Sequence, residues 1–162
     1  GAYEVSLPSF VAFCFGDGSG TACPCSNTGA AGRGCGNSAH AAGCELTASG
    51  TPSISSDTLT LSVTGSVSSQ PGIFFLANNA VGGGLGTAFG DGLRCAGGGV
   101  KRLQVVFAGG AGNASSTVTI SQAAGLVAGD LKRLQWWHRD PIASPCGNGF
   151  NLSNGVEVTW TP

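Results

Sequence analysis

The chain has 162 residues, a length that predicts a single domain. Seven lysines and arginines oppose eight acidic residues, so the formal net charge is -1 and only 9% of the residues are charged. This balance excludes the clustered positive charge with which proteins bind nucleic acid. The sequence also lacks the apolar run of about 18 residues that a membrane-spanning helix needs.

The N-terminal segment, residues 1–13, contains an alternating apolar pattern before the first cysteine. Tyr3, Val5 and Leu7 alternate with polar residues, which predicts a strand. In the default interpretation this strand belongs to the chain's own sheet. Alternatively, residues 1–13 act as a docking strand that completes the sheet of a neighbouring copy. Such a contact, repeated head to tail, produces a fibre.

Cysteines dominate the next segment, residues 14–43, where bulky apolar residues are almost absent after Phe15. Because such a segment cannot stabilise itself by burial, we expect a Cys/Gly-rich loop region closed by disulfides. The six cysteines assigned to disulfides, without a defined connectivity, are Cys14, Cys23, Cys25, Cys35, Cys95 and Cys146. Disulfides form in oxidising compartments, and the first residues show neither the basic nor the apolar region of a signal peptide, so we interpret the chain as a secreted, mature form.

The seventh cysteine is either unpaired or bridges two chains, and Cys44 is the candidate because it begins a predicted strand outside the loop region. The alternative is a buried free cysteine that packs as a small apolar residue. A zinc site is the rival of the disulfide framework, although the spacing lacks the paired knuckles typical of structural zinc. Its ligands would be Cys23, Cys25, Cys35 and Cys44.

Alternation of apolar and polar residues recurs along the chain in short runs bounded by turn residues. About eight short strands favour an all-β, antiparallel β-sandwich of the jelly-roll type, a single domain over residues 1–162. The predicted strands are 3–7, 44–49, 58–64, 72–78, 100–107, 116–121, 131–138 and 156–161. Residues 122–127 are predicted to form a loop or one helical turn. The glycine-rich residues 82–99 are predicted to form one long connection, restrained if Cys95 is joined to Cys146.

Several motifs together resemble a known family. They are Phe-Gly-Asp-Gly at 15–18 and again at 89–92, within the stretches 14–25 and 89–98, then Arg139-Asp140-Pro141, Ser144-Pro145-Cys146-Gly147 and the ending 150–162. This set resembles a Cys/Gly-rich domain of secreted proteins from planctomycete-like bacteria, which has no established activity. The resemblance implies an extracellular module and carries over no catalytic residue. Cys44 departs from the pattern, in which a small or apolar residue is expected.

Groups suited to catalysis are scarce in this sequence. A Ser-His-Asp arrangement could use His138 and Asp140, but no nucleophile elbow is present, and a hydrogen bond at a strand end is the simpler interpretation. Asp17 and Asp91 neighbour glycine in predicted turns and are weak candidates for calcium. We expect no other cofactor or metal, and we predict that the chain is not an enzyme.

Lys-Arg-Leu-Gln occurs at 101–104 and at 132–135, in two predicted strands. If these strands are neighbours, five side chains share one face, namely Arg102, Gln104, Arg133, Gln135 and Trp137. The opposite, core-facing side would hold Leu103, Val105, Phe107, Leu134 and Trp136. An indole stacks on the C–H face of a sugar while Arg and Gln bond its hydroxyls, so this face suits a polysaccharide. Its plainer interpretation is the solvated outside of a sandwich.

Two hypotheses of function follow from these patterns. The leading one is a non-enzymatic, secreted structural module that self-associates into an extracellular filament or surface assembly by exchange of its N-terminal strand. The alternative is a carbohydrate-binding, lectin-like module that uses the Arg/Gln/Trp face. The expected partners are therefore other copies of the chain or an extracellular polysaccharide.

Overall fold

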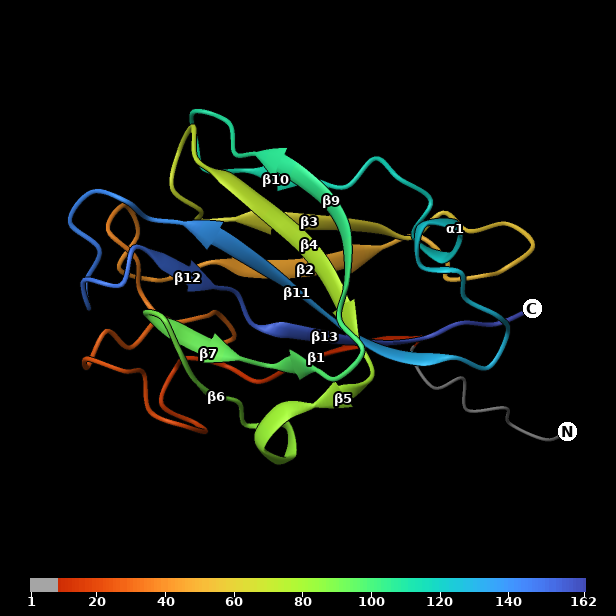
Figure 1. The fold of residues 1–162 in the computed structure, drawn as a ribbon, viewed down its shortest axis with the longest axis horizontal. Helices are drawn as coiled ribbons and strands as arrows, with labels where there is room; N and C mark the ends of the chain where they lie inside the picture. The colour runs from red at the N-terminus through yellow and green to blue at the C-terminus, as the bar shows by residue number, and fades with distance from the viewer. Residues whose placement is uncertain (1–8) are drawn as a thin grey trace, which may run out of the picture.

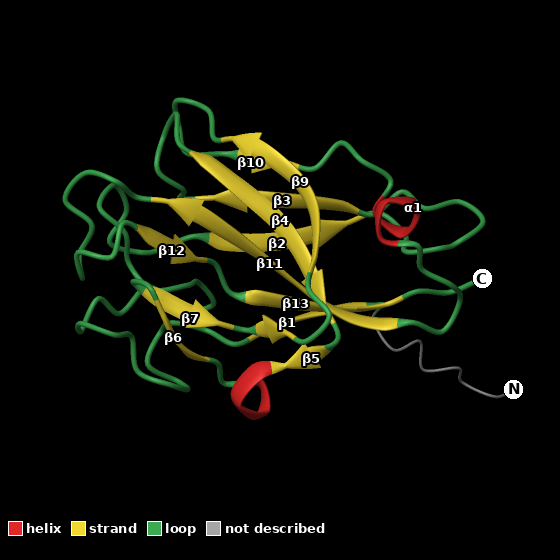
Figure 2. Cartoon of the chain, viewed as in Figure 1, coloured by secondary structure: helices red, strands yellow, loops and turns green. Residues whose placement is uncertain are grey.

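The computed structural model describes residues 9–162, and its regular structure is almost entirely antiparallel β-sheet (Figures 1 and 2), so the predicted all-β class is confirmed. The strands are β1 (Phe10–Phe13), β2 (Glu45–Ser49), β3 (Thr60–Thr64), β4 (Pro71–Ala77), β5 (Asn79–Ala80), β6 (Thr87–Phe89), β7 (Gly92–Arg94), β8 (Ala96–Gly97), β9 (Lys101–Phe107), β10 (Ala114–Ser115), β11 (Leu131–Arg139), β12 (Phe150–Leu152) and β13 (Gly155–Thr159). The helical segments are η1 (Val81–Gly84) and α1 (Ile120–Ala124). Within residues 9–162, neither segment has the length and apolar character that crossing a bilayer requires.

Two sheets pack against each other around the main core. The larger sheet has the strand order β1-β13-β11-β4-β9, with β12 also paired to β11, and the smaller sheet has the order β10-β3-β2. Leu61 and Val63 of β3 are buried against Leu134 and Trp136 of β11 in one apolar cluster. The alternation that predicted these two strands therefore places the core between the sheets.

Two small two-stranded sheets lie over part of the other face of the larger sheet (Figure 1). β5 pairs with β8, and β6 pairs with β7. Phe75, Ala77, Ala96 and Leu152 form a second apolar cluster beneath them. The prediction of one long connection over residues 82–99 is therefore wrong, because backbone pairing builds these strands without a run of bulky side chains.

Residues 116–121, predicted to be a strand, instead lead into the helical turn α1. Ile120 and Ala124 are both buried, since residues four apart lie on the same side of a helix. The turn ends at Gly125, which has the left-handed conformation with φ of 66°. Five residues are too few to reveal a helical period in the sequence. The predicted strand at 3–7 lies outside the described residues.

Three disulfides connect the loop region 14–43 to the rest of the chain and to itself. They join Cys14 to Cys95, Cys23 to Cys35 and Cys25 to Cys146. The expected link between Cys95 and Cys146 is therefore wrong. The zinc alternative is also wrong, because three of its four proposed ligands are disulfide-bonded. Residues 14–43 contain neither helix nor strand, as expected for a loop region.

Candidate functional site

A pocket lies on the outer face of the larger sheet, the face turned away from the main core. Trp136 of β11 is buried in the main core, so its neighbour Trp137 points to the outer face. Trp137 lies opposite Ile73 of β4 on one side and opposite Leu152 of β12 on the other. These three side chains, with Phe75, form an apolar base.

The β6–β7 hairpin forms one side of the pocket, and its turn is the second Phe-Gly-Asp-Gly motif. Asp91 is fully buried, and its two carboxylate oxygens accept the backbone N–H groups of Cys146 and Asn148 at 3.0 and 3.1 Å. This carboxylate therefore fastens the hairpin to the loop that follows β11. Its oxygens are occupied by donors, an arrangement that favours a structural role over the calcium site predicted there.

Phe150 lies between two aromatic rings of the pocket region. Its ring centroid is 5.1 Å from that of Phe89 and 5.4 Å from that of Trp137. Gly90 permits this packing, because a Cβ atom there would lie 2.3 Å from the Phe150 ring, and its φ of 57° is one that side-chain-bearing residues rarely adopt. The hairpin thus holds Phe89 at a fixed distance from the sheet.

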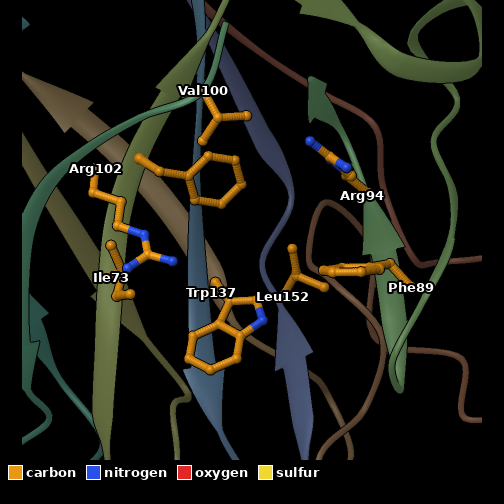
Figure 3. A pocket seen from close by; sticks show the side chains of 8 residues that line it. Ile73, Phe89, Arg94, Val100, Arg102, Trp137 and Leu152 are labelled. Atoms are coloured by element: carbon orange, nitrogen blue, oxygen red, sulfur yellow. The ribbon is translucent and has the colours of Figure 1, made fainter. Parts of the chain in front are cut away.

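The resulting cavity has a volume of about 330 Å³, which lies within the usual range for small-molecule sites. Its lining residues are Ile73, Phe75, Phe89, Arg94, Val100, Arg102, Trp137 and Leu152. Arg102 lies on one side and Arg94 and Phe89 on the other, with Trp137 between them and Val100 at the top of the view (Figure 3). Phe89 is 41% exposed and Trp137 is partly exposed, so solvent reaches both rings.

Two arginines supply the polar groups of the pocket. Arg94 donates through Nε to the carbonyl of Ala96 at 3.2 Å, and its guanidinium carbon lies 5.8 Å from the centroid of the Phe89 ring. Arg102 is exposed, and its side chain makes no hydrogen bond or salt bridge with any residue in the range 9–162. A ligand in the cavity would therefore meet aromatic surface and free guanidinium N–H donors together.

The structure brings two of the five predicted face residues, Arg102 and Trp137, to this pocket. Gln135 lies on the same side of β11 as Trp137, but the covering segments bury it completely and its amide bonds three backbone groups. Arg133 forms a salt bridge to Glu157 at 3.0 Å and does not line the cavity. The prediction of one exposed five-residue face is wrong for Gln135 and, as described next, for Gln104.

A β-bulge in β9 reverses the expected orientation of half of that strand. Gln104 pairs with Phe74 while Arg102 pairs with Phe75, which leaves Leu103 as the additional residue. Leu103 and Gln104 consequently both lie toward the smaller sheet, where Gln104 bonds Thr117. The residues after the bulge, Val105 and Phe107, are exposed instead of buried in the core.

Sequence reasoning missed Arg94, Phe89 and Val100, which lie in or beside the segment predicted to be a connection. Phe89 and Gly92 flank the two-residue turn Gly90-Asp91, and Gly-Asp between two short runs is a hairpin signal. That signal could have located the β6–β7 hairpin and its two side chains. Nothing in the sequence indicates that the hairpin covers this face of the sheet.

Asp17, the other calcium candidate, closes its own loop. Its carboxylate accepts the backbone N–H and hydroxyl groups of Ser19 and, at 3.0 Å, the backbone N–H of Gly32. These hydrogen bonds, the Ser19 hydroxyl first, lower the pKa of Asp17. Residues 9–162 contain no group of three or more His, Cys, Asp and Glu side chains arranged to hold a metal.

The groups considered for nucleophilic chemistry are buried. His138 and Cys44 are both fully buried, so the hypothesis that Cys44 bridges two chains is wrong, and the buried free thiol is what the structure contains. Asp140 accepts the backbone N–H of Ser38 at 2.9 Å and the Ser38 hydroxyl. Burial raises the pKa of Cys44 to about 12, which disfavours the nucleophilic thiolate.

The proposed assembly strand, with Tyr3, Val5 and Leu7, lies outside the described residues. No family model, curated protein or solved structure matches the chain. The resemblance to the planctomycete-like Cys/Gly-rich domain therefore stays a prediction.

Proposed function

We propose that this chain is a secreted, non-enzymatic module that binds a saccharide ring in the pocket on its outer sheet face. The observation that carries the proposal is the position of Trp137 between two arginine-bearing sides of a solvent-accessible cavity (Figure 3). An indole face stacks on the apolar C–H face of a sugar, while guanidinium N–H groups donate to its oxygens. Phe89 adds a second aromatic surface on the side of the pocket where Arg94 lies, opposite Arg102 (Figure 3).

Other features support the secreted location and the non-enzymatic role in this proposal. Three disulfides are typical of a protein that matures in an oxidising compartment, as secreted proteins do. The Cys44 thiol and the His138 imidazole are buried. Three carboxylates accept hydrogen bonds from the chain itself, namely those of Asp17, Asp91 and Asp140.

Tryptophan fluorescence tests the proposal selectively, because the other two tryptophans, Trp136 and Trp160, are buried. An aqueous quencher such as iodide will act mainly on Trp137. We expect a bound saccharide to protect that signal, and we expect Trp137→Ala to abolish binding when it is measured by calorimetry, which does not depend on the indole. Ile142→Ala, which removes an exposed apolar side chain outside the pocket, should leave binding unchanged. Undiminished binding by the Trp137→Ala variant would exclude this pocket as the site.

Self-association is the second proposed function, and an open sheet edge favours it. β9 ends the larger sheet, and its side chains Val105 and Phe107 are 59% and 67% exposed. An apolar edge strand with unpaired backbone groups is a template for another strand. We propose that the alternating segment around Tyr3, Val5 and Leu7 of a second copy pairs with β9, which would build an extracellular filament or surface assembly.

Light scattering over a concentration series tests this second function. We expect the mass of the full chain to rise with concentration, and deletion of residues 1–8 or the substitution Phe107→Lys to keep it monomeric. Val127→Lys changes an equally exposed apolar residue outside β9 and serves as the control. A full chain that stays monomeric at every concentration would exclude assembly by this route.

A further inference from the structure

The pocket has cationic side chains but no acidic ones. Arg94 and Arg102 line it, and none of the lining residues is Asp or Glu. The single salt bridge within residues 9–162 joins Arg133 to Glu157, neither of which lines the cavity. The two guanidinium groups therefore border the same apolar cavity without a neutralising partner among its lining residues.

We infer that the saccharide ligand is acidic and that its carboxylates bind Arg94 and Arg102 on the two sides of the pocket. This inference rests on the proposed function, since it names the ligand class of the same pocket. Arginine presents a planar array of N–H donors that matches a carboxylate and forms hydrogen bonds stronger than those between neutral groups. An apolar base of Ile73, Trp137 and Leu152 strengthens such bonds by lowering the local dielectric.

Arg94 is held in place before any ligand binds. Its Nε atom donates to the carbonyl of Ala96, its guanidinium lies near the Phe89 ring, and its backbone belongs to β7, two residues after Gly92. The two terminal nitrogens of Arg94 make no hydrogen bond within the described part of the chain. An ordered cation with free donors reduces the entropy lost on binding an anion.

The arginines lie beside Trp137, where they favour an anionic substituent at the edge of a sugar ring that stacks on the indole. A sugar stacked on the Trp137 indole would extend its edge substituents toward the two sides of the pocket, where Arg94 and Arg102 lie (Figure 3). A uronic acid carries its carboxylate at that edge, whereas the corresponding neutral sugar carries a CH₂OH group. The neutral sugar would displace water from the guanidinium groups without supplying a charge.

Matched pairs of oligosaccharides test the inference. The probes are trimers of galacturonate, glucuronate and mannuronate, each compared by calorimetry with the neutral trimer of the same linkage and ring configuration. We expect at least one acidic trimer to bind about tenfold tighter than its neutral counterpart, and that advantage to shrink as NaCl rises from low to high concentration. A sulfated derivative of the neutral trimer is included, because a sulfate group is another oxyanion that arginine binds.

Three variants assign the effect to residues. Arg94→Gln and Arg102→Gln should each lower the affinity for the acidic trimer about tenfold and leave the neutral trimer unaffected. Lys132→Gln removes a positive charge from β11 outside the pocket and should change neither affinity.

The outcomes separate this inference from the proposed function. Equal affinity for acidic and neutral trimers, with Trp137 protected in both, would overturn the inference and leave saccharide binding intact. Tighter binding of the sulfated trimer than of every carboxylated trimer would overturn the carboxylate assignment. Failure of every probe to protect Trp137 from iodide would overturn both.

Discussion

The Sγ atom of Cys44 lies 3.3 Å from the Nε2 atom of His138, and both side chains are fully buried. The Nδ1 atom of His138 lies 3.2 Å from the carbonyl oxygen of Arg139, which can only accept a hydrogen bond. The proton therefore belongs on Nδ1, which leaves Nε2 as an acceptor beside the thiol of Cys44, and the carbonyl of Gly65 is a second acceptor for the same S–H at 3.3 Å. This pair is neutral, because burial raises the pKa of the thiol to about 12 and lowers that of the imidazole to about 4.

The first prediction concerns the reactivity of Cys44. A thiol-specific reagent should modify less than a few per cent of the native protein at pH 8, because the thiol is buried and protonated. After unfolding in denaturant without reductant, one thiol per chain should react, since the other six cysteines are in disulfides. Rapid labelling of the folded protein would contradict the buried Cys44–His138 pair.

The second prediction is a loss of stability between pH 6.5 and pH 4. Burial is the main cause of the lowered pKa of His138, and the unfolded chain has the ordinary value near 6.5. In this window the unfolded chain therefore binds a proton that the folded chain does not bind. The free energy of unfolding should fall as the pH falls, by about 3 kcal/mol in total for this group.

Urea unfolding at a series of pH values measures this effect. His138→Gln should be less stable at neutral pH but should lose less stability between pH 6.5 and 4 than the unchanged chain. Burial raises the pKa of Asp57, but hydrogen bonds outweigh it and lower that pKa below 3.8. Asp57 therefore loses its contribution to stability only as the pH falls below about 4, so its effect can be separated from that of His138. Parallel pH profiles for the two proteins would refute the role of His138.

The third prediction tests the close contact between β4 and β11. A Cβ atom at Gly72 would lie 2.0 Å from the Trp136 indole, which is buried in the main core. Gly72→Ala should therefore lower the free energy of unfolding by about 1–3 kcal/mol, as overpacking does. Gly110→Ala, at a position with no atom within 4 Å, should change it by less than about 0.5 kcal/mol. Equal stability of the two variants would argue against this packing.

The fourth prediction ranks the disulfides by the loops that they close. The Cys25–Cys146 disulfide spans 121 residues and the Cys23–Cys35 disulfide spans 12. Replacing both cysteines of a pair by serine should cost about 3 kcal/mol for the short loop and up to about 5 kcal/mol for the long one, because the unfolded chain gains more freedom. Denaturant midpoints followed by circular dichroism give the ranking, and a reversed order would show that native strain dominates.

The strands of the sandwich could be predicted where one side chain in two enters the core. β3 lies close to its predicted position because Leu61 and Val63 alternate there with Thr and Ser. β4 and β11 also lie close to their predicted positions, although each contains consecutive aromatic residues, Phe74-Phe75 and Trp136-Trp137. The bulge at Leu103 could not be predicted, since one additional residue in β9 leaves no mark on the composition of the strand. It nevertheless decides that Gln104 leaves the outer face and that Val105 joins it.

The sequence predicts a flat face and no pocket, and only two of the predicted face residues line the cavity. Arg102 and Trp137 lie on strands, where alternation assigns a face, whereas Arg94 and Phe89 reach the site through a hairpin fixed by backbone contacts and a distant disulfide. Pairing among seven cysteines depends on which loops meet in three dimensions, and sequence spacing does not determine that.

The Cys14–Cys95 disulfide has a mechanical consequence. Phe10 pairs with Val158 and Phe13 with Gly155, so tension applied before β1 and after β13 would pull on the same end of that antiparallel pair. The pair would unzip one residue at a time from Phe10 toward Phe13. The covalent link at Cys14 stops this peeling directly after β1 and transfers the load to Cys95, next to Arg94. A pulled chain would therefore transmit force to the edge of the pocket before the sandwich opens.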